Sequence, residues 1–407
     1  MTTLALLGGA PVRSKPFPHW PISDGSDEEA LLQVLQSGKW GRHQGHFTEE
    51  FEKRFASYQG ARFGIGVANG SVAIRLALHT IGIAPGDEVI VPPITFFSTA
   101  SSVVEVNAVP IFADIHPETY CLDPAAIEAA ITPRTRAIIP VHFAGQAAAM
   151  DEIMAIAKRH ELIVIEDAAH AHGSDYQGKR LGSIGEMSTF SFQASKKLTS
   201  GEGGIILTSD ERHERICRAL HTCGRFPESA WYDHQLLGGN YRMNEFQAAL
   251  LSAQFSRLEE QVMRREANGL FLNAELAQIP GVRPLGRGYG ETRHGYYLYI
   301  FRYDPAGFGG LPREKFLEAL AAEGVPCTSG YDRPLYRQPV FLNRSFGPYA
   351  QADSQYPDYA LTSCPVSEQA CQEAIWLAQP LLLGDESDMH DIVSAVAKIS
   401  ENYKELL

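Results

Sequence analysis

The run Leu162-Ile163-Val164-Ile165-Glu166-Asp167 indicates the fold class, because four apolar residues lead directly into two carboxylates. Four successive apolar residues predict a strand that is buried on both faces, as the strands of a parallel sheet are. A carboxylate at the end of such a strand is costly to bury unless it is paired. A helix cap, an ion pair or a cationic ligand would each pair with it, so Asp167 is a candidate site residue.

The pattern around this run repeats an apolar strand, a polar turn and an amphipathic helix between residues 61 and 210. Such alternation predicts an α/β fold, in which a mostly parallel sheet is covered by helices on both faces and binds ligands at the carboxyl ends of its strands. The expected helices include residues 72–80, 124–130 and 150–159. The seven expected strands are residues 63–67, 88–91, 109–112, 137–141, 162–166, 189–192 and 204–207.

The rest of the chain predicts a second, smaller α+β part. A long helical pattern over residues 244–276 leads to a strand over 295–301 and to helices over 313–323 and 387–404. We therefore expect a large domain over residues 1–255, with an N-terminal arm, and a small domain over residues 256–407. The stretch 330–365 is rich in Tyr, Arg, Pro and Asp, so we expect a loop that contacts substrate.

The composition excludes several classes of protein. The 407 residues are 44% hydrophobic and 20% charged, as in an ordinary globular protein, and the net charge of -13 argues against a nucleic-acid partner. The six cysteines form no Cys-x-x-Cys pair, which favours free thiols in a reducing compartment over zinc or disulfides. The N-terminus has no basic region followed by a long apolar core, so we expect a cytoplasmic protein without a membrane span.

Lys196 is the second candidate site residue. It lies in the run Phe190-Ser191-Phe192-Gln193-Ala194-Ser195-Lys196-Lys197-Leu198-Thr199-Ser200-Gly201-Glu202-Gly203-Gly204, among small and polar residues. A lysine held in a pocket can lose its proton and form a Schiff base with an aldehyde. A carboxylate such as Asp167 and a lysine such as Lys196 are the two groups that pyridoxal phosphate chemistry requires.

Weaker signals accompany these two residues. Asn69-Gly70-Ser71 opens an expected helix, where backbone N–H groups can bind a phosphate or simply form an ordinary N-cap. Phe96 follows a strand and could stack on a flat ring or pack in the core. His170 and His172 lack the further ligands of a metal site, so no metal is expected. All of these groups fall at strand ends of one sheet, where a single pocket could collect them.

With these residues in place, the chain resembles the fold-type I, pyridoxal phosphate-dependent sugar aminotransferases of the DegT/DnrJ/StrS family. The resemblance runs from about Trp20 to the C-terminus. Its motifs are Asn69-Gly70-Ser71-Val72-Ala73, Val91-Pro92-Pro93-Ile94-Thr95-Phe96, Pro140-Val141-His142-Phe143-Ala144-Gly145, Glu166-Asp167-Ala168-Ala169-His170-Ala171-His172-Gly173, the lysine segment, and Gly239-Asn240-Tyr241-Arg242-Met243-Asn244-Glu245.

The resemblance implies a role for each matching residue. Lys196 would carry the cofactor as a Schiff base, and Asp167 would pair with its pyridine nitrogen. Phe96 would stack on the cofactor ring, and Gly70, Ser71 and Ser191 would bind its phosphate. His170 would lie near its hydroxyl side. Asn240 would reach the cofactor phosphate of a neighbouring subunit, which implies a homodimer with shared active sites.

Two departures from the family pattern concern the lysine segment. Many members that act on nucleotide sugars have His where Gln193 stands and Asn where Lys197 stands. Lys197 raises the question of which lysine is catalytic, and the spacing from Phe192 favours Lys196. The segment is more similar to a branch that contains the glutamine-dependent scyllo-inosose (cyclitol) aminotransferases and the aminohydroxybenzoate synthases.

This branch implies ping-pong transamination from L-glutamine or L-glutamate to a keto-cyclitol or keto-sugar. A nucleotide-sugar aminotransferase, an aminohydroxybenzoate-type dehydration and a cofactor-binding regulatory protein without turnover remain alternatives. A nicotinamide dehydrogenase is disfavoured, because no Gly-x-Gly-x-x-Gly follows the early strands. Candidate substrate contacts, which could equally be exposed loop residues, are Arg225, His294, Tyr331, Tyr336 and Arg337.

Overall fold

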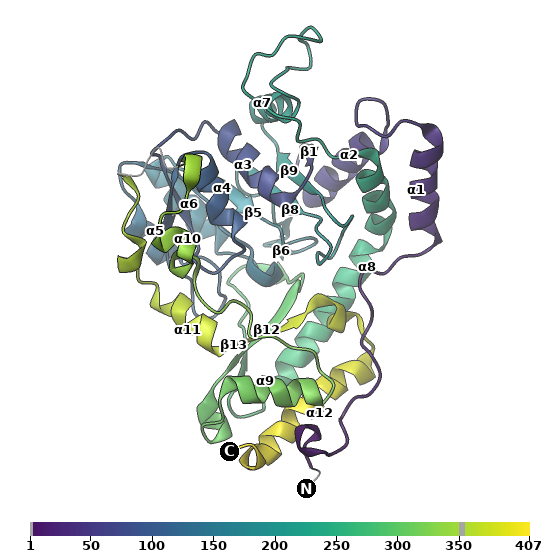
Figure 1. Ribbon diagram of the computed structural model, residues 1–407, viewed down its shortest axis with the longest axis vertical. Coiled ribbons are helices and arrows are strands. Elements are labelled where there is room, and N and C mark those ends of the chain that lie inside the picture. Colours follow the sequence, from purple (N-terminus) through teal and green to yellow (C-terminus); the bar gives the residue numbers. More distant parts are fainter. Residues whose placement is uncertain (1–2, 350–354) are drawn as a thin grey trace.

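The computed structural model of the protein describes residues 3–349 and 355–407 (Figure 1). Its main sheet has seven strands in the order β1-β9-β8-β5-β4-β2-β3. Strand β9 runs antiparallel to both of its neighbours, and the remaining pairs are parallel. The bounds are β1 Phe63–Val67, β2 Glu88–Val91, β3 Val109–Phe112, β4 Thr135–Ile138, β5 Ile163–Asp167, β8 Met187–Ser191 and β9 Gly204–Thr208. The expected α/β fold with a mostly parallel seven-stranded sheet is therefore confirmed.

Helices cover this sheet, and their ends follow local capping chemistry. The Asn69 side chain accepts a hydrogen bond from the backbone N–H of Val72 and so caps α3, while Asp123 caps α5 ahead of Pro124. Helix α4 was not among the expected segments, because its Ser, Thr and Val residues have low helix propensity. The bounds are α1 Gly25–Ser37, α2 Phe47–Gln59, α3 Gly70–Thr80, α4 Ser98–Glu105, α5 Pro124–Ala130, α6 Met150–His160 and α7 Glu211–His221.

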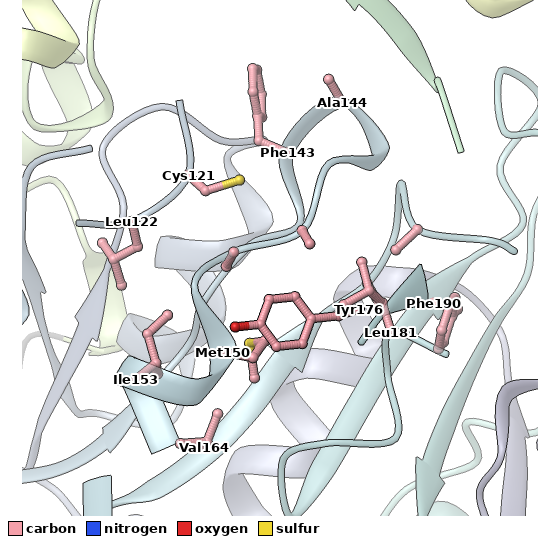
Figure 2. Packing of buried hydrophobic residues seen from close by; sticks show 14 of the residues in the cluster. Cys121, Leu122, Phe143, Ala144, Met150, Ile153, Val164, Tyr176, Leu181 and Phe190 are labelled. Carbon is pink, nitrogen blue, oxygen red and sulfur yellow. The ribbon is translucent and has the colours of Figure 1, made fainter. Parts of the chain in front are cut away.

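The core has two layers, one on each face of the main sheet. Successive residues of β2 alternate between them, since Val89 and Val91 belong to one cluster and Ile90 to the other. Figure 2 shows part of the cluster that contains Ile90, where Val164 of β5 packs near Tyr176 and Met150. Burial on both faces is what the apolar run before Asp167 predicted.

Helix α8 (Glu245–Leu276) leads from the main sheet to the opposite end of the molecule (Figure 1). There β10 (Val282–Pro284), β12 (Leu298–Tyr303) and β13 (Ala374–Ala378) form an antiparallel sheet. Helices α9 (Arg313–Ala322), α11 (Pro365–Glu373) and α12 (Glu386–Asn402) belong to this half of the chain. Residue 255, the expected domain boundary, lies inside α8, so the division into domains stays a prediction.

Strand β12 starts at Leu298, later than the expected residue 295. Tyr296 has a φ of 42°, in the left-handed region, so the backbone just before the strand cannot be extended. In a third sheet, β6 (Asp175–Tyr176) pairs on one side with β11 (Glu291–Arg293) and on the other with β7 (Lys179–Arg180). It joins the segment before β12 to the loop that follows β5.

The stretch 330–365 is mainly irregular, as expected. Its regular pieces include η4 (Leu335–Arg337), α10 (Pro339–Leu342) and η6 (Tyr359–Leu361), and residues 350–354 lie outside the described part. The other short helices are η1 Ala5–Leu7, η2 Phe143–Gly145, η3 Pro305–Phe308, η7 Gln379–Leu383 and η8 Tyr403–Glu405. Within residues 3–349 and 355–407, no helix has both the length and the apolar character that a membrane crossing requires.

Candidate active site

A cavity of about 690 Å³ opens at the edge of the main sheet where β5 and β8 end. Segments that are far apart in the sequence form its wall. It brings together eight of the predicted site residues, namely Gly70, Ser71, Phe96, Asp167, His170, Ser191, Lys196 and Tyr331. Their roles toward a cofactor or substrate stay predictions, but the expected convergence at the strand ends is present.

Lys196 and Lys197 have different surroundings although they are adjacent. Burial lowers the pKa of Lys196 to about 8, while the Asp167 carboxylate acts in the opposite direction. Lys197 is buried away from the cavity, and its Nζ donates a 2.8 Å hydrogen bond to the Gly295 carbonyl. Of the two lysines, only Lys196 lines the cavity, as an amine that can act as nucleophile and base near neutral pH.

Asp167 ends β5 and is 4% exposed. Its Oδ2 accepts a 2.8 Å hydrogen bond from Thr99 Oγ1, and its Oδ1 accepts a 3.2 Å bond from the backbone N–H of Ala169. Burial raises the pKa of the Asp167 carboxyl, against the effect of these bonds. A buried carboxylate in this state is stabilised by a cationic partner, such as a protonated ring nitrogen.

The N-terminus of α3 faces Ser191 at the end of β8. Gly70 is the first residue of α3, and a Cβ added there would come within 2.9 Å of the Ser191 Cβ. Gly70, Ser71 and Ser191 all line the cavity. A helix N-terminus provides free N–H groups and a positive dipole end, so this corner suits a phosphate.

His170 and Phe96 provide flat groups on the cavity wall. Burial lowers the pKa of His170 well below its ordinary value, so the ring is neutral, and its Nδ1 accepts a 3.3 Å hydrogen bond from the backbone N–H of Ala144. Phe96 is 60% exposed, which is unusual for a phenylalanine. An exposed aromatic face at a strand end is available for stacking on a planar ligand.

Tyr297 also lines the cavity and was not among the predicted site residues. Its ring stacks on His170 with 4.0 Å between centroids, and Lys196 Nζ lies 4.3 Å from its centroid. The sequence signal was the aromatic run over residues 296–301, which is also typical of an ordinary core strand. Trp376 of β13 lines the same cavity. It was not predicted, because an aromatic residue in an apolar strand is also typical of an ordinary core strand.

The remaining predicted residues lie elsewhere in this chain. Arg225 lines a second cavity of about 810 Å³, beside Arg42 and Arg218. His294 is buried and stacks on Tyr296. Tyr336 is buried, and its hydroxyl donates a hydrogen bond to the Glu368 carboxylate. The same carboxylate accepts a hydrogen bond from Arg337. Asn240 is exposed and follows, in the chain, the segment that projects beyond α7 (Figure 1).

The contacts of these five residues with substrate or cofactor stay predictions.

The residues of the site cavity fit pyridoxal phosphate. This cofactor needs an amine, a carboxylate for its ring nitrogen, a phosphate-binding site and an aromatic face. One cavity provides all four, from Lys196, Asp167, Gly70 and Phe96 in that order. Thr189 adds a further polar atom, because its buried Oγ1 has no hydrogen-bond partner within the described parts of the chain. Among the described residues, no group of three or more His, Cys, Asp or Glu side chains is placed to bind a metal ion.

Comparisons with known proteins agree with this geometry. The chain matches the DegT/DnrJ/EryC1/StrS aminotransferase family over residues 21–397. It is 40% identical to an L-glutamine:2-deoxy-scyllo-inosose aminotransferase of Streptoalloteichus tenebrarius, over 99% of each chain. The crystal structure of 3-amino-5-hydroxybenzoic acid synthase has a TM-score of 0.86 and 34% identity, covering 96% of this chain and 100% of that one.

A further structure bears on the cofactor. It is ntda from Bacillus subtilis with bound cofactor PMP, which has a TM-score of 0.81 and 25% identity, covering 96% of this chain and 86% of that one. Matched over nearly its whole length, the chain belongs to the DegT/DnrJ/EryC1/StrS aminotransferase family and is an enzyme that uses pyridoxal phosphate.

Proposed function

We propose that the protein transfers the amino group of L-glutamine to the carbonyl carbon of a keto-cyclitol in two half-reactions. The observation that carries the proposal is Lys196, whose pKa burial lowers to about 8 in the same cavity as the strand-end carboxylate Asp167. The choice of donor and acceptor is supported by the name of the relative from Streptoalloteichus tenebrarius.

Lys196 is the group that moves the proton. With a pKa of about 8, a substantial fraction of its Nζ is neutral at pH 7 to 8 and can accept the proton of the donor α-carbon. Pyridoxal phosphate, when bound, supplies the conjugated ring that accepts the electron pair left on that carbon. In the second half-reaction Lys196 returns a proton, and the amino group ends on the ketone carbon.

Asp167, Phe96 and the α3 corner orient the reaction. Asp167 is fixed by Thr99, which holds the carboxylate in one position at the end of β5. Gly70 and Ser191 form the corner that would hold the phosphate, and Phe96 would cover one face of the ring. These residues would hold a planar cofactor at three points, so that Lys196 would act on the same face in both half-reactions.

The cavity lining supports a small acceptor without a diphosphate. Among the described residues that line it there is no arginine, and Lys196 is the one lysine. A nucleotide diphosphate is recognised mainly by cationic and bidentate donors. Aromatic groups such as Tyr331 and Trp376 instead suit a hydroxylated six-membered ring, whose C–H face packs on aromatic rings.

Each half-reaction can be tested separately by absorbance. L-Glutamine should convert the lysine-bound cofactor band of the purified holoenzyme to the pyridoxamine form, and 2-deoxy-scyllo-inosose should restore it with formation of an amino-cyclitol detectable by mass spectrometry. L-Glutamate should act more slowly, since its second carboxylate has no arginine to meet in the described lining.

The other outcomes decide between the alternatives. Turnover with a nucleotide-linked keto-hexose and none with the cyclitol ketones would overturn the proposed acceptor. Loss of water from a cyclic substrate without amino transfer would favour the aminohydroxybenzoate-type reaction. Failure of every amino acid to change the band would overturn aminotransfer itself.

We also propose that the enzyme acts as a homodimer in which Asn240 completes the site of the neighbouring subunit. The segment that precedes Asn240 projects from the body of the protein after α7 (Figure 1). Trp231, Tyr232 and Leu237 of this segment are 80%, 79% and 100% exposed. Large apolar side chains on a projecting segment suit burial against a second copy of the chain.

A further inference from the structure

Tyr297 lies against the reactive lysine, and the roles assigned so far leave it unused. Lys196 Nζ is 4.3 Å from the centroid of its ring. This is within the range of about 6 Å over which an ammonium group is attracted to an aromatic face. His170 stacks on the same residue, but burial keeps the pKa of His170 well below its ordinary value. Of these two neighbours, only Lys196 can bring a positive charge to the ring.

The backbone around Tyr297 is held in an unusual conformation. Tyr296 and Ala144 are both left-handed, with φ of 42° and 58°. The N–H of Tyr297 donates a 2.7 Å hydrogen bond to the carbonyl of Ala144, whose own N–H donates to His170. Left-handed conformations of residues other than glycine are costly and persist where the surroundings fix them. The backbone position from which the Tyr297 side chain starts is therefore fixed by the surrounding fold.

The hydroxyl of Tyr297 fixes the far end of the ring. It lies 2.8 Å from Ser195 Oγ, and the Ser195 hydroxyl donates a 2.7 Å bond to Gln193 Oε1. Because a serine has a single hydroxyl proton, Tyr297 is the donor in the bond between the two hydroxyls. Its proton is thus engaged with Ser195, which leaves the ring face as the part of Tyr297 that acts on Lys196.

We propose that Tyr297 is a positioning residue that holds the protonated Lys196 Nζ inside the cavity while the lysine is not bonded to the cofactor. The use of this contact in catalysis rests on the proposed function. In the first half-reaction the neutral Nζ takes a proton from the donor α-carbon, the electron pair of that C–H bond stays with the carbon, and Nζ becomes an ammonium group. The ring stabilises this ammonium group until its proton is returned.

Other groups around Lys196 also affect its charge. Asp167 favours the ammonium form, and burial favours the neutral form. Five further titratable groups lie on the neighbouring segments or line the same cavity. They are His170, His172, Lys197, Glu202 and Tyr331. A test must therefore change the ring and leave these groups and the apolar volume in place. Tyr297→Leu does so, and Tyr297→Phe is the matched control that removes the hydroxyl alone.

The test measures the pKa of Lys196 in the apoprotein, without substrate or turnover. Wild type, Tyr297→Leu and Tyr297→Phe are labelled with acetic anhydride between pH 6 and 11, and the modification of Lys196 is quantified by peptide mass spectrometry. The exposed Lys39 serves as the internal reference for reagent reactivity. Circular dichroism of each variant shows whether it is folded.

The wild type should give a pKa of about 8 for Lys196. Loss of the aromatic face in Tyr297→Leu should lower it by about one pH unit, because the ammonium form loses a favourable contact. Tyr297→Phe should stay near the wild-type value. A pKa in Tyr297→Leu that is unchanged or raised would overturn the proposal, and so would an equal shift in Tyr297→Phe.

A fluorinated phenylalanine at position 297 tests the same idea if the leucine variant does not fold. Fluorine weakens the negative face of the ring while nearly keeping its size, so the pKa of Lys196 should again fall. An unchanged pKa would contradict the proposal. Since the apoprotein is used, the result is independent of whether L-glutamine or a keto-cyclitol proves to be the substrate.

Discussion

At the scale of single residues, adjacent side chains of the same type have opposite surroundings. Glu166 lies beside Asp167, but its carboxylate bonds His142 and the backbone N–H groups of Gly182, Ile184 and Gly185. Successive residues of a strand point to opposite faces, so one carboxylate ties a loop to the sheet and the other lines the cavity. The two neighbouring lysines lie in the bend after β8 and also have different surroundings, since only Lys196 lines the cavity.

This separation predicts different outcomes for the two lysines. Lys196→Ala should abolish the lysine-bound cofactor band and reduce kcat by about 10³-fold or more, because the group that moves the proton is lost. Lys197→Met keeps the buried volume and removes only the bond to Gly295, so the band should remain and kcat should fall by about tenfold at most. Absorbance spectra and steady-state kinetics of both variants check this. Loss of the band in Lys197→Met with retention in Lys196→Ala would assign the chemistry to Lys197.

At the scale of elements, the end of β8 and the start of α3 make one corner of the site. Their approach requires a residue without a side chain at position 70, where an added Cβ would meet the Ser191 Cβ at 2.9 Å. The pairing of β8 with β9, and of β9 with β1, places this strand end beside the helix that follows β1. Sheet order thus brings together two segments that are about 120 residues apart in the chain.

Gly70→Ala should therefore weaken cofactor binding. The added methyl group must displace Ser191 or the first turn of α3, and overpacking of this kind costs about 1–3 kcal/mol, or roughly a 5- to 150-fold rise in Kd. Gly25→Ala is the matched control, because Gly25 is also the first residue of a helix and a Cβ there meets nothing within 4 Å. Titration of each apoprotein with pyridoxal phosphate measures the two Kd values. Equal values would show that the α3 corner does not hold the phosphate.

At the scale of the whole molecule, the site cavity lies where the two halves of the chain meet. Its wall combines strand ends of the main sheet with Tyr297, Tyr331 and Trp376 from the C-terminal half. The proposed homodimer would add Asn240 from a second chain. In such a dimer the activity of one subunit would depend on residues of the other, which mixing experiments can detect.

Lys196→Ala and Asn240→Ala subunits should each be nearly inactive alone and regain activity when mixed. In a mixed dimer one site has both intact residues, so random exchange should restore about a quarter of the wild-type activity. Activity after mixing under subunit-exchange conditions measures this, with Lys196→Ala refolded alone as the control. No recovery, with mixed dimers demonstrated by mass spectrometry, would place Asn240 and Lys196 in independent sites.

The sequence by itself determined the seven strands of the main sheet and several of the helices that cover it, since hydrophobic periodicity and helix caps are local properties. It also made Asp167 and Lys196 candidate site residues, because a carboxylate after a buried strand and a lysine before a glycine-rich turn are visible along the chain. Only the tertiary structure decided that Tyr297 lies on Lys196 and that Tyr297 and Trp376 line the same cavity. Those contacts depend on strand register, on the left-handed Tyr296 and on segments about 100 residues apart, none of which has a local signal.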